Sequence, residues 1–221
     1  MKILGVVGGI SPESTIEYYR LLGSAPVIIN SIDLKRLLEL MAANELDAVT
    51  EYIAEAVQRL AAAGAEVGLI AANTPHVVFD QIQRRSTIPL ISIVEATCDE
   101  AKSRGLRRLA LFGTRYTMAG RFYPDVFSRE GIAIVPPSAD EQTFIHDIYL
   151  GELVKGIVLP ETRARLLTIA DQMKARVSID GVILGGTDLS LILRDGDAAV
   201  PLLDTTRIHV RAALAALRAS A

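Results

Sequence analysis

Short runs of Val, Ile and Leu alternate along this chain with longer amphipathic segments, and this alternation most strongly constrains its fold. Short, continuously apolar runs are typical of parallel strands that are buried on both faces. The expected strands cover residues 3–7, 27–30, 67–71, 90–93, 109–113, 132–135 and 182–185. Because the segments between them have helical periodicity, we expect an α/β fold in which helices cover mainly parallel sheets.

Three of the expected helices have recognisable boundary signals. Residues 46–66 repeat apolar side chains at helical spacing and reach Gly64, a residue type that favours the end of a helix. Ser138 and Glu141 have the spacing of a capping box at a helix start. Residues 204–220 are rich in helix formers and provide a C-terminal helix.

Composition excludes several classes of function. The 221 residues are 50% hydrophobic and 22% charged, enough for a large core in one domain or in two small similar halves. The net charge is -3 without a run of Lys or Arg, so no nucleic-acid partner is expected. No segment has the length of a membrane span or the pattern of a signal peptide, so we expect a cytoplasmic protein without a membrane partner.

The cysteine and histidine content gives little reason to expect metal or thiol chemistry. The only cysteine, Cys98, lies in an apparently helical segment and is expected to be an inert buried thiol. The three histidines are scattered and form no metal-binding motif. We therefore expect no metal and no other cofactor.

Small and hydroxylated residues follow four of the expected strands. They lie in segments 6–14, 70–76, 111–117 and 183–190, two in each half of the chain. Ligands of open parallel sheets bind beyond the carboxyl ends of the strands. We therefore expect the four loops to converge on one cavity between two similar halves.

The loops of the first half offer neutral polar groups and one histidine. Ser11 and Pro12 mark a helix start, where free amides attract an anion, although a tight turn without a ligand is an equal alternative. Asn73 and Thr74 can hold a carboxylate or, alternatively, cap the next helix through an Asx or ST turn. His76 is a candidate proton carrier or a packed side chain.

The second half repeats this chemistry with hydroxyls and one carboxylate. Thr114 and Thr117 flank a turn and are candidate ligand groups or helix caps. Thr187 precedes Asp188, which could orient an ammonium group, act as a base or cap the next helix. Lys155 lies near a helix end, where a cation is favourable even as a solvated charge.

In this order, the four loops resemble those of the aspartate/glutamate racemase family of cofactor-independent amino-acid racemases. The resemblance rests on "GVVGGISPESTIEYY", "NTPH", "LFGTRYTMAGRFY", "GGTDL" and the tail "PLLDTTRIHVRAAL", which together extend over nearly the whole chain. It implies two pseudo-symmetric flavodoxin-like halves, each a mainly parallel sheet flanked by helices, with the site in the cleft between them. Residues 1–95 with the C-terminal helix 205–221 would form the first half and residues 96–204 the second, within a single racemase-type unit of residues 1–221. The resemblance also implies a homodimer.

This chain departs from the family at the groups that exchange protons. In the family, the first half carries Cys-Asn-Thr and the second Gly-Cys-Thr, usually followed by an acidic residue. The positions that match these motifs are Asn73, Thr74, Thr187 and Asp188. The two cysteine positions are occupied by Ala72 and Gly186, which cannot exchange a proton. Racemisation requires an acid/base group on each face of the α-carbon, so Asp188 and His76 are the candidate replacements.

Other positions extend the resemblance. Thr114 and Thr117 match the loop that binds the substrate carboxylate, and Lys155 falls near a lysine that aspartate racemases use for the distal carboxylate. Residues 30–37 are more similar to the aspartate/glutamate-specific branch of the family. The connection at Gly23–Ser24 is shorter than is usual in the family, and we expect a loop to be missing there.

These observations leave alternative functions open. The first is an isomerase that acts on a small amino or dicarboxylic acid with a non-thiol acid/base. The second is a catalytically inactive homologue that binds or senses an amino acid, as the loss of both cysteines indicates. A lyase or decarboxylase ranks below both.

Overall fold

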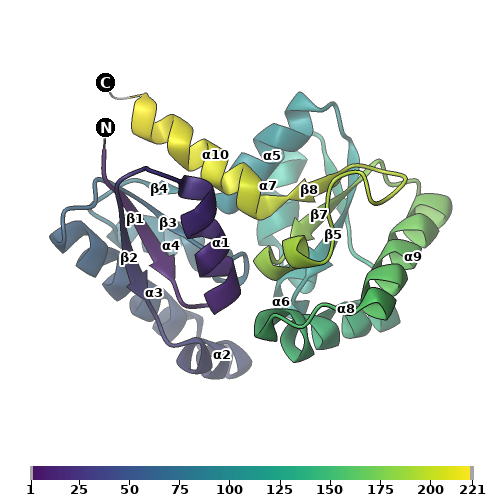
Figure 1. Cartoon of the computed structure of the whole chain (residues 1–221), viewed down its shortest axis with the longest axis horizontal. Helices are drawn as coiled ribbons and strands as arrows, with labels where there is room; N and C mark the ends of the chain where they lie inside the picture. Colours follow the sequence, from purple (N-terminus) through teal and green to yellow (C-terminus); the bar gives the residue numbers. More distant parts are fainter. Residues whose placement is uncertain (1, 220–221) are drawn as a thin grey trace. The chain divides into compact units, whose positions relative to one another are not determined.

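A computed structural model of the chain describes residues 2–219 (Figure 1). It divides into two compact units. Unit 1 contains the residues up to Ile93 and those from His209 on, and unit 2 extends from Val94 to Ile208. The boundaries between the units fall within α5 (Ile93–Ser103) and α10 (Thr205–Arg218). Each unit contains one four-stranded parallel sheet flanked by helices, which confirms the predicted α/β fold.

In unit 1 the sheet has the strand order β2-β1-β3-β4, and all neighbouring strands are parallel. The strands are β1 (Leu4–Gly8), β2 (Val27–Ser31), β3 (Val67–Ile70) and β4 (Leu90–Ile91). The helices between them are α1 (Pro12–Leu22), α2 (Leu34–Ala42), α3 (Leu46–Ala62), the short 3-10 helix η1 (Thr74–Val78) and α4 (Phe79–Arg85).

The core of unit 1 lies between its sheet and two helices distant in sequence. Tyr18 of α1 and Val210 of α10 pack with Leu4 and Val6 of β1 in one buried cluster. Figure 1 shows α1 and α10 on the nearer face of this sheet and α3 on the farther face. The unit is therefore a sheet covered on both faces, as its continuously apolar strands predict.

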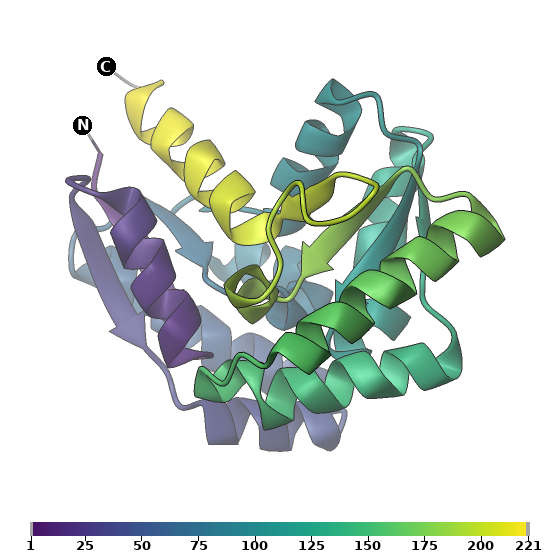
Figure 2. The ribbon, with the colours of Figure 1, turned by 45° about the vertical axis from the view of Figure 1, so that its right-hand side comes forward.

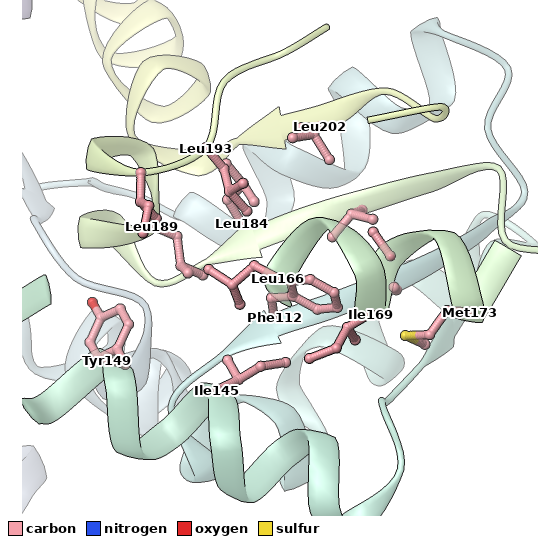
Figure 3. Close-up of a cluster of buried hydrophobic side chains, with 14 of the residues drawn as sticks. Phe112, Ile145, Tyr149, Leu166, Ile169, Met173, Leu184, Leu189, Leu193 and Leu202 are labelled. Carbon is pink, nitrogen blue, oxygen red and sulfur yellow. The ribbon is translucent and has the colours of Figure 1, made fainter. Parts of the chain in front are cut away.

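Unit 2 has the equivalent strand order β6-β5-β7-β8, again fully parallel. Its strands are β5 (Arg108–Gly113), β6 (Ala133–Val135), β7 (Gly181–Gly185) and β8 (Leu202–Asp204). Its further helices are α6 (Arg115–Ala119), α7 (Phe122–Arg129), α8 (Ala139–Gly151), η2 (Leu153–Lys155), α9 (Pro160–Val177) and η3 (Thr187–Leu191). The helices α8 and α9 pack on one face of the sheet (Figure 2), where Phe112, Ile145, Leu166 and Leu184 form part of the core (Figure 3).

The predicted helix boundaries follow from local chemistry and are confirmed. Ser138 and Glu141 form both bonds of a capping box at the start of α8. The helix α3 ends just before Gly64, whose φ of +101° favours glycine. At Gly23–Ser24 the backbone closes a turn, in which the amide of Ala25 donates to the carbonyl of Leu22 at 3.2 Å.

Two strand predictions need correction. The run 90–93 was expected to be a strand, but β4 ends at Ile91 and Ile93 already begins α5. The sequence reasoning missed β8, because only three residues of the tail form a strand. This strand pairs with β7 and completes the sheet of unit 2.

Candidate functional site

The four predicted loops form two pairs, one in each unit. In unit 1, β1 and β3 are neighbours, and Val7 is paired with Ile70 near their carboxyl ends. In unit 2, β5 and β7 are neighbours, and Gly113 is paired with Gly185 at theirs. Because the strands are parallel, the two loops of each unit leave its sheet at the same edge, where ligands of such sheets bind.

The loop after β1 is a rigid turn that Ser11 connects to α1. The Ser11 side chain accepts a hydrogen bond from the amide of Ser14 at 3.4 Å, which confirms its role as the N-cap. Gly9 has a φ of +84°, and its amide donates to Oγ1 of Thr15 at 2.9 Å. A Cβ at Gly9 would lie 2.7 Å from the amide nitrogen of Ile32, so the turn requires glycine. Ligand binding by Ser11 stays a prediction.

The loop after β3 contains the methyl group of Ala72, the amide of Asn73 and the hydroxyl group of Thr74. Asn73 precedes η1 but makes no side-chain capping bond to it, so its side chain is not used as an Asx cap. It is buried, and Thr74 is half-buried. Ala72 is buried as well and brings no group that can carry a proton.

His76 lies in the same loop but is fully engaged with the backbone. Its Nδ1 is 2.9 Å from the carbonyl oxygen of Ala72, and its Nε2 accepts from the amide of Ile93 at 3.2 Å. Burial lowers the pKa of His76 to about 3, with a further contribution from His209. The ring also stacks on Phe79. It is therefore neutral near pH 7, and neither ring nitrogen is available to a substrate in this arrangement.

His209, from α10, has a similar structural role in unit 1. Its Nδ1 is 2.8 Å from the hydroxyl of Tyr18, and its Nε2 is 2.9 Å from the carbonyl oxygen of Ile91. Burial lowers the pKa of His209 to about 4. Together His76 and His209 bind the backbone on both sides of Ser92, which explains why β4 stops at Ile91.

The loop after β5 holds a buried pair of hydroxyl groups. Thr114 is the N-cap of α6 and accepts from the amide of Thr117 at 3.3 Å, so the predicted capping role is confirmed. The two Oγ1 atoms are 3.2 Å apart. A Cβ at Gly113 would lie 2.6 Å from the carbonyl oxygen of Gly185. The backbones of β5 and β7 therefore approach each other closely at this exit.

At the exit of β7, a tyrosine ring fills the space beside Gly186. The backbone of Gly186 is extended, with a φ of -144°, a conformation open to any residue. A Cβ at this position would nevertheless lie 2.9 Å from Cζ of Tyr149 and closer still to Cε2. Tyr149 of α8 therefore occupies the volume that a side chain at 186 would need.

The Asp188 carboxylate accepts a hydrogen bond from the hydroxyl group of this tyrosine. The Tyr149 hydroxyl donates to Oδ2 of Asp188 at 2.8 Å, and Asp188 is only 1% exposed. Gly186, not Asp188, is the residue that precedes η3, so Asp188 is not its cap. Burial and the Asp188 charge raise the pKa of Tyr149 well above its ordinary value, whereas hydrogen bonds from the Thr187 side chain and the Asp188 backbone lower it. In Figure 3 the Tyr149 hydroxyl points away from α8.

Two other predicted residues lie outside the four loops. Lys155 is the last residue of η2 and is exposed, and η2 contacts η3, the helix that follows β7. Cys98 is buried within α5, and burial raises the pKa of its thiol to about 11. The predicted burial of Cys98 is therefore confirmed, and its lack of reactivity stays a prediction.

The sequence reasoning missed two residues near the strand exits of unit 2. Tyr149 lies 37 positions before Gly186. Only two features point to it: it lies on the buried face of α8, and the backbone of Gly186 has a conformation that does not require glycine. Thr206 follows β8 at the start of α10. It is 1% exposed, and its hydroxyl has no hydrogen-bond partner among residues 2–219. Its burial was not evident from the tail motif.

The described part of the chain offers neither a cluster of metal ligands nor a membrane-spanning helix. Residues 2–219 contain no group of three or more His, Cys, Asp or Glu side chains placed to hold a metal ion. Within the same range, no helix is both long enough and apolar enough to cross a bilayer.

Comparisons with known proteins agree on one family. The family model described as Asp/Glu/Hydantoin racemase matches residues 7–213. The chain is 22% identical to a broad specificity amino-acid racemase of Bacillus subtilis (strain 168), over 92% of this chain and 93% of that protein. It is similar in structure to a candidate Asp/Glu racemase from Yersinia pestis, with a TM-score of 0.88, 34% identity and coverage of 98% and 99% of the two chains. An aspartate racemase homologue from Pyrococcus horikoshii OT3 gives a TM-score of 0.84 and 32% identity, with the same coverage.

Proposed function

This chain belongs to the Asp/Glu/Hydantoin racemase family, and from this premise we propose that it binds a small amino or dicarboxylic acid and exchanges the proton on its α-carbon without a thiol. The observation that carries the proposal is the buried hydroxyl pair of Thr114 and Thr117 at the exit of β5. Neutral donors can hold a carboxylate without adding a second buried charge.

Several side chains at the strand exits are proposed to bind the ligand. They are Ser11, Asn73, Thr74, Thr114, Thr117 and Thr187, with Lys155 for a distal carboxylate. All but Lys155 are hydroxyl or amide groups that are buried or half-buried. Such groups orient a ligand by hydrogen bonds, whereas an exposed ammonium adds a long-range attraction to anions.

Asp188 is the proposed proton-exchanging group of unit 2. It is the carboxylate at the exit of β7, two positions after Gly186, which has no side chain. We assign the proton transfer of unit 1 to no side chain, because Ala72 carries only a methyl group and both nitrogens of His76 are hydrogen-bonded to the backbone. Use of His76 would require the hydrogen bond from Ile93 to break first.

Hydrogen–deuterium exchange at the α-carbon tests the chemistry directly. The NMR signals of the α-protons of L- and D-aspartate and L- and D-glutamate are followed in deuterated water with the natural protein and with Asp188→Asn. We expect exchange by the natural protein and a loss of about 100-fold or more in Asp188→Asn, the usual contribution of a general acid or base. Lack of exchange with every ligand that binds contradicts the proposed activity.

The proposed binding groups are tested separately by thermal shift. A ligand that binds only the folded state raises the melting temperature by mass action. Thr114→Val should reduce the rise caused by aspartate or glutamate, whereas Thr168→Val, which removes an exposed hydroxyl on α9, should leave it unchanged. An equal rise in both variants would contradict the role of Thr114.

One observation favours a second candidate function, a catalytically inactive protein that binds or senses an amino acid. Neither Ala72 nor Gly186 can carry a proton, and His76 is occupied by the backbone. This candidate predicts that an amino acid raises the melting temperature while its α-proton does not exchange. The two experiments above therefore separate the candidates.

We also expect a homodimer. Unit 1 exposes Ile16 and Tyr19 on α1 and Ile29 on the edge strand β2, at 43%, 57% and 38% of their surfaces. Light scattering in solution measures the mass, and a monomer at micromolar concentration contradicts this expectation.

A further inference from the structure

Tyr149 is placed at the exit of β7 by its packing against Gly186. It lies on the buried face of α8 with Ile145 and Ile148. Because the backbone of Gly186 is extended, glycine is needed there for the close approach of the ring and not for its conformation. A Phe ring would fill the same space, so packing alone does not account for the hydroxyl group.

The hydroxyl of Tyr149 has both donor and acceptor contacts. It donates to Oδ2 of Asp188 at 2.8 Å, and it is hydrogen-bonded by the Thr187 side chain and by the backbone of Asp188. Tyr149 is 7% exposed and Asp188 only 1%, so the tyrosine is the more exposed residue of the pair. Because the phenol oxygen already accepts two hydrogen bonds, one of them must open before the oxygen can take a proton, and that proton then displaces the phenol proton onto the carboxylate.

We propose that Tyr149 is a catalytic residue that exchanges a proton with the α-carbon of the ligand and shares that proton with Asp188. This inference rests on the proposed function and assigns the direct contact with the reacting atom to Tyr149, with Asp188 behind it. In the forward step, the bond between the α-carbon and its hydrogen breaks and the electron pair stays on the carbon. The proton joins the Tyr149 oxygen while the phenol proton moves to Oδ2 of Asp188.

The return step reverses these movements. The phenol gives its proton to the carbanion, and Asp188 restores the proton of the phenol, so both side chains regain their original state. A free phenolate never accumulates in either direction, which removes the obstacle that burial and the neighbouring carboxylate would otherwise present. No oxidant, reductant or further reactant is needed.

The test compares Tyr149→Phe with a matched loss of a buried phenol in the same unit. Tyr123 of α7 is fully buried and is hydrogen-bonded to Thr97, so Tyr123→Phe is the control. Exchange at the α-carbon of L- and D-aspartate and L- and D-glutamate is followed by NMR in deuterated water. We expect Tyr149→Phe to lose about 100-fold or more of the exchange rate, while the rise in melting temperature caused by the ligand is retained. Tyr123→Phe should exchange at the rate of the natural protein.

The outcomes separate the two proposals. Equal exchange rates in the natural protein and in folded Tyr149→Phe overturn the role of Tyr149 and leave the proposed function intact. Absence of exchange in the natural protein with ligands that raise its melting temperature overturns both. Loss of exchange together with loss of ligand binding in Tyr149→Phe overturns the catalytic role and indicates a binding role instead.

A second variant keeps the test decisive if Tyr149→Phe does not fold. Replacement of Tyr149 by 3-fluorotyrosine retains the hydroxyl and nearly the same shape but lowers the pKa of the phenol. If Tyr149 transfers the proton, the more acidic phenol changes the rate of exchange measured at one pH, and fluorotyrosine at position 123 leaves the rate unchanged. An identical exchange rate for the natural protein and the position 149 variant overturns the proposal.

Discussion

The ring of Tyr149 lies so close to the α-carbon of Gly186 that no larger residue fits at position 186 without movement of the ring. The glycine has an extended backbone that any residue could adopt, so only the ring imposes this restriction. The sizes of residues 149 and 186 are therefore coupled, although they lie on different elements of unit 2. This coupling can be measured as stability.

Gly186→Ala should reduce the free energy of unfolding by about 1–3 kcal/mol, the usual effect of overpacking a core. Urea denaturation at pH 7 measures the change. Gly151→Ala is the matched control, because a Cβ at the end of α8 meets no atom within 4 Å. That control should be neutral or slightly stabilising. Equal effects of the two changes would show that the ring moves at no cost.

Removal of the ring should make room for a thiol at position 186. Gly186→Cys alone is expected to be destabilised for the same steric reason, and Tyr149→Ala alone by about 3 kcal/mol or more because it leaves a cavity. The double variant should therefore be more stable than the sum of the two changes predicts. Additive changes in urea denaturation would contradict the steric coupling.

The hydrogen bond between Tyr149 and Asp188 should be visible in a double-mutant cycle. Tyr149→Phe and Asp188→Asn are each expected to be destabilising, and their coupling energy should be about 1.5–3 kcal/mol, typical of a hydrogen bond to a charged group. The control cycle pairs Tyr123→Phe with Asp188→Asn and should be additive. A coupling energy as small as that of the control would mean that the hydrogen bond between Tyr149 and Asp188 contributes nothing to stability.

Features that depend on local chemistry were predictable from the sequence. The capping residues Ser11, Thr114 and Ser138 each accept from the amide three positions ahead, so their neighbours suffice to identify them. Most strands were found because buried parallel strands are apolar throughout. The order of the loops and their resemblance to a family identified the strand exits.

Contacts between distant residues were not predictable in the same way. The contact of Tyr149 with Gly186 depends on how α8 packs on its sheet, which no local pattern specifies. The carbonyl of Ala72 and the amide of Ile93 engage His76, and the second of these is 17 positions away. The sequence could indicate that His76 is near a strand exit but not that its nitrogens are occupied.

Cys98 should be unreactive in the folded protein. Its thiol is buried, and a pKa of about 11 leaves roughly one molecule in a thousand as thiolate at pH 8. A colorimetric thiol assay should therefore detect almost no thiol in the native state and one per chain in urea. Rapid reaction of the native protein would contradict the burial of Cys98.

The two buried histidines should make unit 1 sensitive to acid. Their pKa values in the folded state are about 3 for His76 and about 4 for His209, below the ordinary value of about 6.5 in an unfolded chain. The unfolded state therefore binds more protons at mildly acidic pH. The stability that neutral histidines contribute is complete above about pH 6.5 and is lost as the pH falls toward their folded pKa values.

Between about pH 6 and pH 4.5, each of these histidines should lower the free energy of unfolding by up to about 1.4 kcal/mol per pH unit. Urea denaturation at several pH values measures this slope. His209→Gln should make the slope shallower because one titrating group is removed, even though the variant is less stable at pH 7. His146→Gln is the comparison, since His146 is only half-buried; burial, and then the charge of Arg115, also lower its pKa. If His209→Gln and the natural protein have the same slope, His209 is already protonated in the folded state or is exposed to solvent, and the hydrogen bond to Ile91 does not hold it in the core.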